Sequence, residues 1–142
     1  MNDATKPAWR KVAETILALR WGDQDAFNHV NNAMYLRYIE EARVRWLADI
    51  AGDWDRSATS QPIMAAVHAN YRRPLTWPGE IVVQLFCERL GTSSITLAHR
   101  IVDASDESVL YMDGNVVMVW IDPATGKSVA LPDAVRKACA PV

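Results

Sequence analysis

Residues 20–45 read RWGDQDAFNHVNNAMYLRYIEEARVR, and this stretch decides the fold of the chain. It contains a short loop in which a single residue separates two acids, Asp23 and Asp25. Asn31 and Asn32 follow the loop, and asparagine is a residue type that opens helices. The pattern therefore predicts a carboxylate close to the positive end of a helix, where a carbonyl group can be bound and attacked.

A long amphipathic helix is predicted from Asn32 to about Asp49. Arg37, Glu41 and Arg45 fall on one flank at i,i+4 spacing, which suits contact with water. The opposite face carries a stripe of mostly apolar residues at helical spacing, namely Tyr35, Leu36, Ile39, Ala42, Arg43, Trp46, Leu47 and Ile50. A stripe of this width is typical of the central helix of a domain.

Most of the remaining chain is predicted to form β-strands. The apolar run Ile16 to Leu19 predicts a first strand at 13–20. Alternating apolar residues predict four more strands, at 62–71, 80–90, 94–103 and 108–121. The first of these four is expected to place on one face Ile63, Ala65, Val67, Ala69 and Tyr71. A short C-terminal helix is predicted at 131–138.

The simplest arrangement of these elements is an antiparallel sheet that covers one long helix, a single α+β domain over residues 1–142. Tight turns separate most of the predicted strands, which suits antiparallel neighbours. Several strands carry apolar residues on both faces, notably at 116–121. We therefore expect one sheet face to be covered by the helix and the other by another subunit.

The composition is that of an ordinary globular protein, with half of 142 residues apolar and a net charge of −2. A nucleic-acid partner is not expected, because such binders show a basic face and a high pI. No signal peptide and no membrane-spanning run is found, so we expect a cytoplasmic protein without a membrane partner. Cys87 and Cys139 form no CxxC pair, which argues against a disulfide framework. Core or subunit contacts are expected for Trp21, Trp46, Trp77 and Trp120.

Asp25 is the candidate catalytic residue, and two interpretations of the acid pair stay open. Asp23 and Asp25 either shape the turn and balance the helix end, or act chemically, since neighbouring carboxylates raise one another's pKa. Free backbone N–H groups are expected near Asn32, and one such donor aimed at an oxyanion is worth about 3–4 kcal/mol. Alternatively, the asparagine side chains occupy those donors. His29 is either a general acid or a support for the loop.

Other chemistries have no matching motif. The three histidines lack the HxxxH or HxH spacing of zinc and iron sites, so no metal is predicted. His68 and His99 fall in different strands and are expected to be packing or surface residues. The chain has no GxSxG elbow, GxGxxG loop or P-loop. A serine hydrolase and a nucleotide-binding fold are therefore not expected, and no cofactor is predicted.

The stretch WGDQDAFNHVNNAMYLRYIEEAR, residues 21–43, closely resembles the 4-hydroxybenzoyl-CoA thioesterase-like branch of the hotdog-fold acyl-CoA thioesterases. Similar segments are NYRRPLTWPGEIVV, CERLGTSSITL, VWID and LPDAVR, so the likeness extends from about Ala13 to Arg136. It implies a five-stranded antiparallel sheet wrapped around one long helix. It also implies an acyl-CoA substrate and a homo-oligomer, dimer or tetramer, with active sites at the subunit interface.

The resemblance implies roles for individual residues. Asp25 matches the second acid of the family's GDxD loop, which attacks the thioester as a nucleophile or activates water as a general base. The backbone N–H of Asn32 would polarise the thioester carbonyl. Candidates for the acyl pocket are Tyr35, Tyr38 and Glu41. The hairpin at 89–94, from either subunit, would meet the pantetheine or nucleotide end through Arg89, Thr92, Ser93 and Ser94.

Two departures from the aryl-CoA enzymes concern the substrate. The hairpin carries no cluster of basic residues, so the nucleotide is expected to lie largely outside the protein. His29 and Asn31 match instead the HVNN variants that resemble long-chain acyl-CoA thioesterases. The alternative function is a binding module of the same fold that holds acyl-CoA without hydrolysing it.

Overall fold

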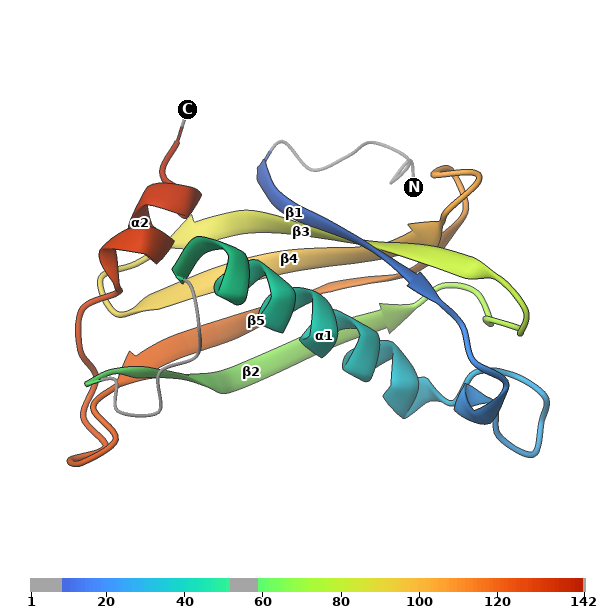
Figure 1. Cartoon of the computed structure of the whole chain (residues 1–142), viewed down its shortest axis with the longest axis horizontal. Coiled ribbons are helices and arrows are strands. Elements are labelled where there is room, and N and C mark those ends of the chain that lie inside the picture. Colours follow the sequence, from blue (N-terminus) through green and yellow to red (C-terminus); the bar gives the residue numbers. More distant parts are fainter. Residues whose placement is uncertain (1–8, 52–58, 142) are drawn as a thin grey trace.

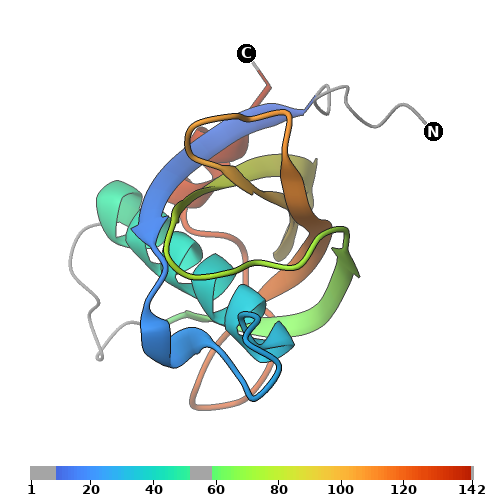
Figure 2. The ribbon, with the colours of Figure 1, turned by 90° about the vertical axis from the view of Figure 1, so that its right-hand side faces the viewer.

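Five strands form one antiparallel sheet that curves around a long helix, α1 (Figures 1 and 2). The computed structural model describes residues 9–51 and 59–141. Across the sheet the order is β1-β3-β4-β5-β2, where the strands are β1 (Arg10–Ala18), β2 (Gln61–Tyr71), β3 (Glu80–Leu90), β4 (Ser94–Asp103) and β5 (Leu110–Ile121). The helices are α1 (Asn32–Ala51), α2 (Asp133–Cys139) and the single turn η1 (Trp21–Asp23). The predicted α+β architecture is confirmed.

The strand boundaries follow the prediction most closely where tight turns flank the strand. β3 and β4 occupy the predicted ranges 80–90 and 94–103. β1 begins at Arg10, before the predicted start, because Arg10 and Lys11 also pair with β3 and Val12 packs against the core. The sequence also predicts a surface loop at 51–61, most of which lies outside the described residues.

β2 departs from simple alternation. The register of β2 against β5 shifts around Ala65. Val67 pairs with the buried Val116, whereas Ile63 pairs with Val119 on the opposite face. The prediction that Ile63 and Val67 share a face is therefore wrong, because one extra residue in a strand reverses the direction of the side chains beyond it.

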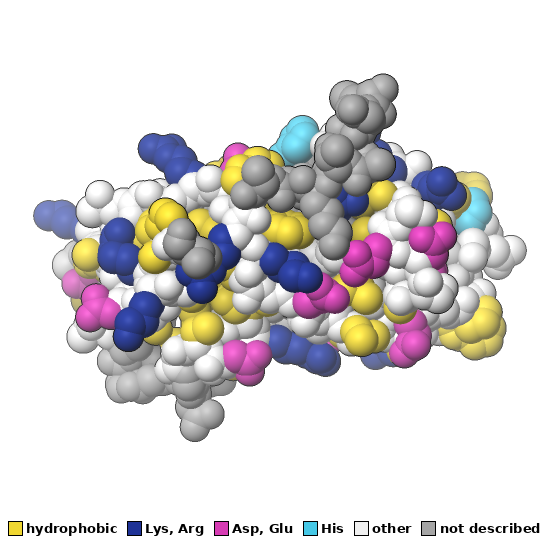
Figure 3. Space-filling model, turned by 90° about the horizontal axis from the view of Figure 1, so that it is seen from above, with side chains coloured by type: hydrophobic (Ala, Val, Ile, Leu, Met, Phe, Trp, Pro, Cys, Tyr) yellow, Lys and Arg dark blue, Asp and Glu magenta, His cyan; other side chains and the backbone are white. Residues whose placement is uncertain are grey.

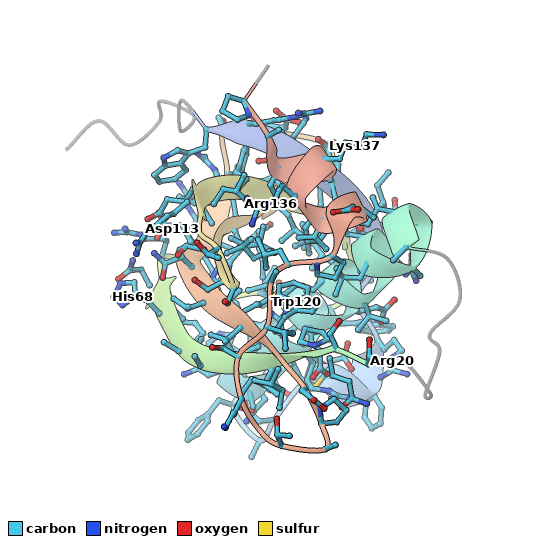
Figure 4. All side chains as sticks on the ribbon, turned by 90° about the vertical axis from the view of Figure 1, so that its left-hand side faces the viewer. Arg20, His68, Asp113, Trp120, Arg136 and Lys137 are labelled. Carbon is cyan, nitrogen blue, oxygen red and sulfur yellow. The ribbon has the colours of Figure 1, made fainter. Side chains whose placement is uncertain are left out.

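The concave face of the sheet packs on the predicted stripe of α1. The helix buries Tyr35, Tyr38, Ile39, Ala42, Arg43, Trp46 and Leu47. Leu36, which the prediction included, is 37% exposed. Trp120 lies in the interior, and Lys137 on α2 points away from it (Figure 4). Trp21 and Trp77 are exposed, so their predicted place in the core is wrong and a subunit contact remains a prediction.

Both faces are buried in β3 and β4, where Val82, Phe86, Ala98 and Val102 point away from α1 and are at most 5% exposed. β5 instead alternates between buried and half-buried residues. Acidic and basic side chains are interspersed with hydrophobic patches on the face shown in Figure 3. Within the described residues, no helix is long and apolar enough to cross a membrane.

The two cysteines, distant in sequence, meet in the fold. Cys87 on β3 and Cys139 on α2 are both buried and free, and their thiols are hydrogen-bonding neighbours. Burial raises the pKa of the Cys139 thiol to about 12, and the nearby Cys87 adds to the effect. Sequence spacing gave no sign of this contact.

Candidate active site

The loop between β1 and α1 is held in one conformation by its own backbone. The N–H of Asp25 donates to the carbonyl of His29 at 2.9 Å, and the N–H of Asn28 donates to the carbonyl of Asp25 at 3.0 Å. Asn28 has a φ of 60°, a conformation that asparagine adopts more readily than most residues. The N–H of Val30 donates to Leu75 at 2.8 Å and ties the loop to the segment before β3.

The two acids of the loop have different surroundings. Asp23 is only 4% exposed, and its carboxylate accepts hydrogen bonds from the Tyr38 hydroxyl at 2.7 Å and the Arg20 N–H at 3.1 Å. Burial and the bond to Asp23 raise the pKa of Tyr38 well above its ordinary value. Asp23 therefore holds the loop to α1, as the turn-shaping interpretation predicts for this acid.

Asp25 is half-buried and lies beside the start of α1. Its Oδ1 accepts the N–H of Phe27 at 2.9 Å, and its Oδ2 lies 3.5 Å from Nδ2 of Asn31. The amide oxygen of the same side chain, Asn31 Oδ1, accepts the N–H of Ala33 at 2.9 Å and so caps the helix. One asparagine thus connects the carboxylate to the helix N-terminus.

Asn32 is the first residue of α1, and its backbone N–H donates to no group in residues 9–51 or 59–141. Of the two open alternatives, the asparagine side chain occupies the N–H of Ala33, but it leaves the N–H of Asn32 without a partner among the described residues. The Asn32 carbonyl accepts the Tyr71 hydroxyl at 3.0 Å, which anchors this end of α1 to β2. A free N–H at the positive helix end suits an oxygen that gains negative charge.

The residues predicted for the acyl pocket lie within the first three turns of α1, in different surroundings. The Tyr35 hydroxyl donates to the Arg73 carbonyl at 3.0 Å and accepts the N–H of Leu75 at 2.9 Å. Tyr38 and Glu41 line a cavity of about 570 Å³ between α1 and β1. Their contacts with substrate remain predictions.

His29 contributes to the loop through its backbone. Its carbonyl accepts the N–H of Asp25, while its exposed imidazole makes no hydrogen bond within the described part of the chain. Whether the ring acts as an acid or as a support therefore remains a prediction.

The hairpin at 89–94 lies at the opposite end of α1 from the Asp25 loop (Figure 1). At 1.5 Å per residue, the 20-residue helix is about 30 Å long. The hairpin is held instead by α2, because a terminal nitrogen of Arg136 donates to the carbonyls of Gly91 and Thr92 at 3.0 and 3.1 Å. The predicted roles of Arg89, Thr92, Ser93 and Ser94 therefore require the hairpin of a second protomer.

Sequence reasoning missed the roles of Asn31, Tyr71 and Arg136. The NN pair signals a helix cap, but the second hydrogen bond of Asn31 goes back six residues to Asp25. Tyr71 and Arg136 reach backbone carbonyls 39 and about 45 residues away in the chain. Contacts at such separations leave no local pattern in one sequence.

The chain matches the model of the thioesterase-like superfamily over residues 19–139. It is 27% identical over 125 residues to the long-chain acyl-CoA thioesterase FadM of Escherichia coli, covering 87% of this chain and 94% of FadM. A solved structure from Xanthomonas campestris, provisionally assigned as an acyl-CoA thioesterase, is 53% identical with a TM-score of 0.76. The match covers 84% of this chain and all of that one.

A second solved structure, from Pseudomonas aeruginosa and provisionally assigned as a thioesterase, is 36% identical with a TM-score of 0.87. It covers 92% of this chain and all of that one. The chain therefore belongs to the thioesterase-like superfamily. The predicted hotdog fold and the predicted membership among thioester hydrolases are confirmed.

Proposed function

We propose that this protein hydrolyses acyl-CoA thioesters, with Asp25 as the reacting carboxylate and the N–H of Asn32 as the oxyanion donor. The observation that carries the proposal is a half-buried carboxylate bonded to the helix cap Asn31, close to the start of α1, where the N–H of Asn32 has no partner among the described residues. The names of FadM and of the Xanthomonas relative support acyl-CoA as the substrate.

The reaction balances by either of two routes. As a nucleophile, the Asp25 carboxylate adds to the thioester carbon, and the carbonyl oxygen takes up the negative charge. The C–S bond then breaks, the CoA thiolate departs, and the mixed anhydride that remains on Asp25 is hydrolysed by water. As a general base, Asp25 accepts a proton from the water that attacks the same carbon; the oxyanion then collapses, the C–S bond breaks, and the CoA thiolate takes up the proton from Asp25 as it departs. In both routes the N–H of Asn32 stabilises the oxyanion.

The proposal includes a homo-oligomer, because the hairpin at 89–94 is distant from Asp25 within one protomer. A second protomer would bring its hairpin, and with it Arg136, to the CoA of the first site. Arg136 supplies a positive charge at a hairpin that has no basic cluster of its own. The number of subunits and the cytoplasmic location remain predictions.

The test measures thiol release from short-chain, long-chain and aromatic acyl-CoAs. Asp25→Asn keeps an oxygen acceptor for the N–H of Phe27, so the loop should persist while turnover falls roughly 10²-fold or more. Asn32→Pro removes the backbone N–H together with the amide side chain and should keep the helix, because proline suits the first helical position. We expect kcat to fall about 10²- to 10³-fold. Asn32→Ala keeps the N–H and is the matched control.

Two outcomes oppose the proposal. Full turnover in Asp25→Asn would remove this carboxylate from the mechanism. If acyl-CoAs raise the melting temperature of the wild-type protein and no free thiol appears with any acyl group, the protein is a binding module instead.

A further inference from the structure

A second cavity lies on the other flank of α1, between the helix and the strands β2, β4 and β5. Its volume is about 170 Å³. Most of its wall is apolar, but three side chains with nitrogen donors, Arg37, Arg43 and His99, also line it, and Arg37 is paired with Glu40. Mostly apolar walls with a few polar groups are typical of sites that bind small molecules.

The cavity follows the face of α1 that begins at Asn32. Leu36, Glu40 and Arg43 succeed Asn32 at intervals of three or four residues and line the cavity. At 1.5 Å per residue, Arg43 lies about 16 Å along the helix axis from Asn32. β2 runs beside this face, since Tyr71 bonds to Asn32 at one end and Met64 lines the cavity further along. The cavity therefore lies on the same face of α1 as Asn32, about one to three turns further along the helix.

His99 is 1% exposed, and neither ring nitrogen has a hydrogen-bond partner within the described residues. The carbonyl of His68 lies near the ring and favours its protonated form, while the His68 side chain points outward (Figure 4). Burial has the larger effect and lowers the pKa of His99 to about 4. The ring is therefore neutral near pH 7, with one N–H donor and one acceptor. Buried polar atoms of this kind normally have partners, so the empty positions need an explanation.

Arg43 is 6% exposed and makes no hydrogen bond or ion pair with the described residues. Burial lowers its pKa. Glu40, one turn earlier, attracts its charge, but the Glu40 carboxylate is bonded to Arg37 at 2.5 Å. The Arg43 guanidinium has no bonded acceptor among the described residues, so an oxygen acceptor supplied from elsewhere would be bound favourably.

We propose that His99 and Arg43 form a specificity subsite for acyl groups that carry an oxygen function, a hydroxyl or carboxylate, at the end remote from the thioester. The proposal rests on the function proposed above, because the acyl group reaches the cavity only if the thioester lies at Asn32. The guanidinium donates to the distal oxygen, and the neutral imidazole N–H donates a second bond. A methyl end leaves both donors unpaired, and sites of this kind discriminate strongly against such analogues.

The experiment compares three acyl-CoAs of matched chain length that end in a methyl, a hydroxyl or a carboxylate group. For the wild-type protein we expect kcat/KM at least about tenfold higher with an oxygenated end. In Arg43→Met the ratio should fall towards one. His99→Gln, a milder change, should lower the same ratio, and Lys137→Met on α2 is the control.

Binding of the same compounds to Asp25→Asn, measured by calorimetry, separates this proposal from the proposed function. A preference for oxygenated ends in binding without any hydrolysis in the wild-type protein would reject the function and keep the subsite. Equal affinities for the three ends would overturn the subsite. If Arg43→Met lowers kcat/KM equally for all substrates and also dissociates an oligomer, a partner protomer supplies the acceptor and the subsite is rejected.

Discussion

His99 makes the stability of the protein depend on pH. Its pKa is lowered from 6.5 to about 4, first by burial and then by the charge of Arg43. Between these values the unfolded chain binds more protons than the folded one, so the free energy of unfolding falls as the pH falls. The difference in pKa corresponds to about 3 kcal/mol.

We therefore expect the wild-type protein to be about 2–3 kcal/mol less stable at pH 4.5 than at pH 7.5, measured by urea denaturation. His99→Gln cannot titrate and should show a flatter profile over this range. Asp103 and Asp106 also have lowered pKa values, but from 3.8, so their contribution to the loss begins at lower pH. A wild-type profile as flat as that of His99→Gln would contradict the prediction.

Asn31 joins two functions that a different side chain can separate. Its Oδ1 caps α1, and its Nδ2 lies near Asp25. Serine keeps a capping oxygen but has no amide donor, so Asn31→Ser should change the free energy of unfolding by less than about 0.5 kcal/mol. Turnover should nevertheless fall severalfold, because Asp25 loses the contact that orients it.

Asn31→Ala provides the comparison for Asn31→Ser. It removes the cap as well and should cost about 1 kcal/mol of stability, measured by urea denaturation, with a similar loss of turnover. If Asn31→Ser retains wild-type kcat, the contact between Asn31 and Asp25 does not orient the carboxylate.

Local patterns predict the elements of this fold better than they predict the contacts between them. α1 is recoverable from its 3.6-residue stripe, and β3 and β4 from alternation around Gly91. The shift around Ala65 is not recoverable, because a bulge depends on the partner strand rather than on the apolar pattern.

The candidate site, too, has features that the sequence predicts and features that only the fold shows. Asp25 and Asn32 follow from the loop-and-helix pattern, and their roles follow from the family resemblance. The separation of the two acids into a buried anchor and a half-buried carboxylate depends on Tyr38, 15 residues after Asp23. No spacing rule links a loop acid to a tyrosine 15 residues later in the chain, so this distinction required the fold.

The whole molecule has two sheet edges, and they differ in what they expose. β1 exposes Ile16 among charged residues, whereas β2 exposes Ile63, Met64, Val67 and Tyr71, each at least 42% accessible. Long exposed edge strands with apolar side chains tend to pair with another chain. β2 is also the strand beside the α1 face that begins at Asn32. Pairing through β2 would therefore place a second protomer next to the candidate site.

We expect the wild-type protein to sediment as a dimer or a larger assembly, and Ile63→Glu to shift it towards the monomer, because a buried unpaired charge opposes edge pairing. Ile16→Glu makes the same change on β1, where Ile16 is 62% exposed, and should leave the assembly intact. Thioesterase activity should fall when Ile63→Glu dissociates the assembly, because one protomer alone does not bring the 89–94 hairpin to Asp25. Full activity in a monomeric Ile63→Glu protein would show that a single chain forms the complete site. If Ile16→Glu dissociates the assembly and Ile63→Glu does not, the interface lies at β1 instead.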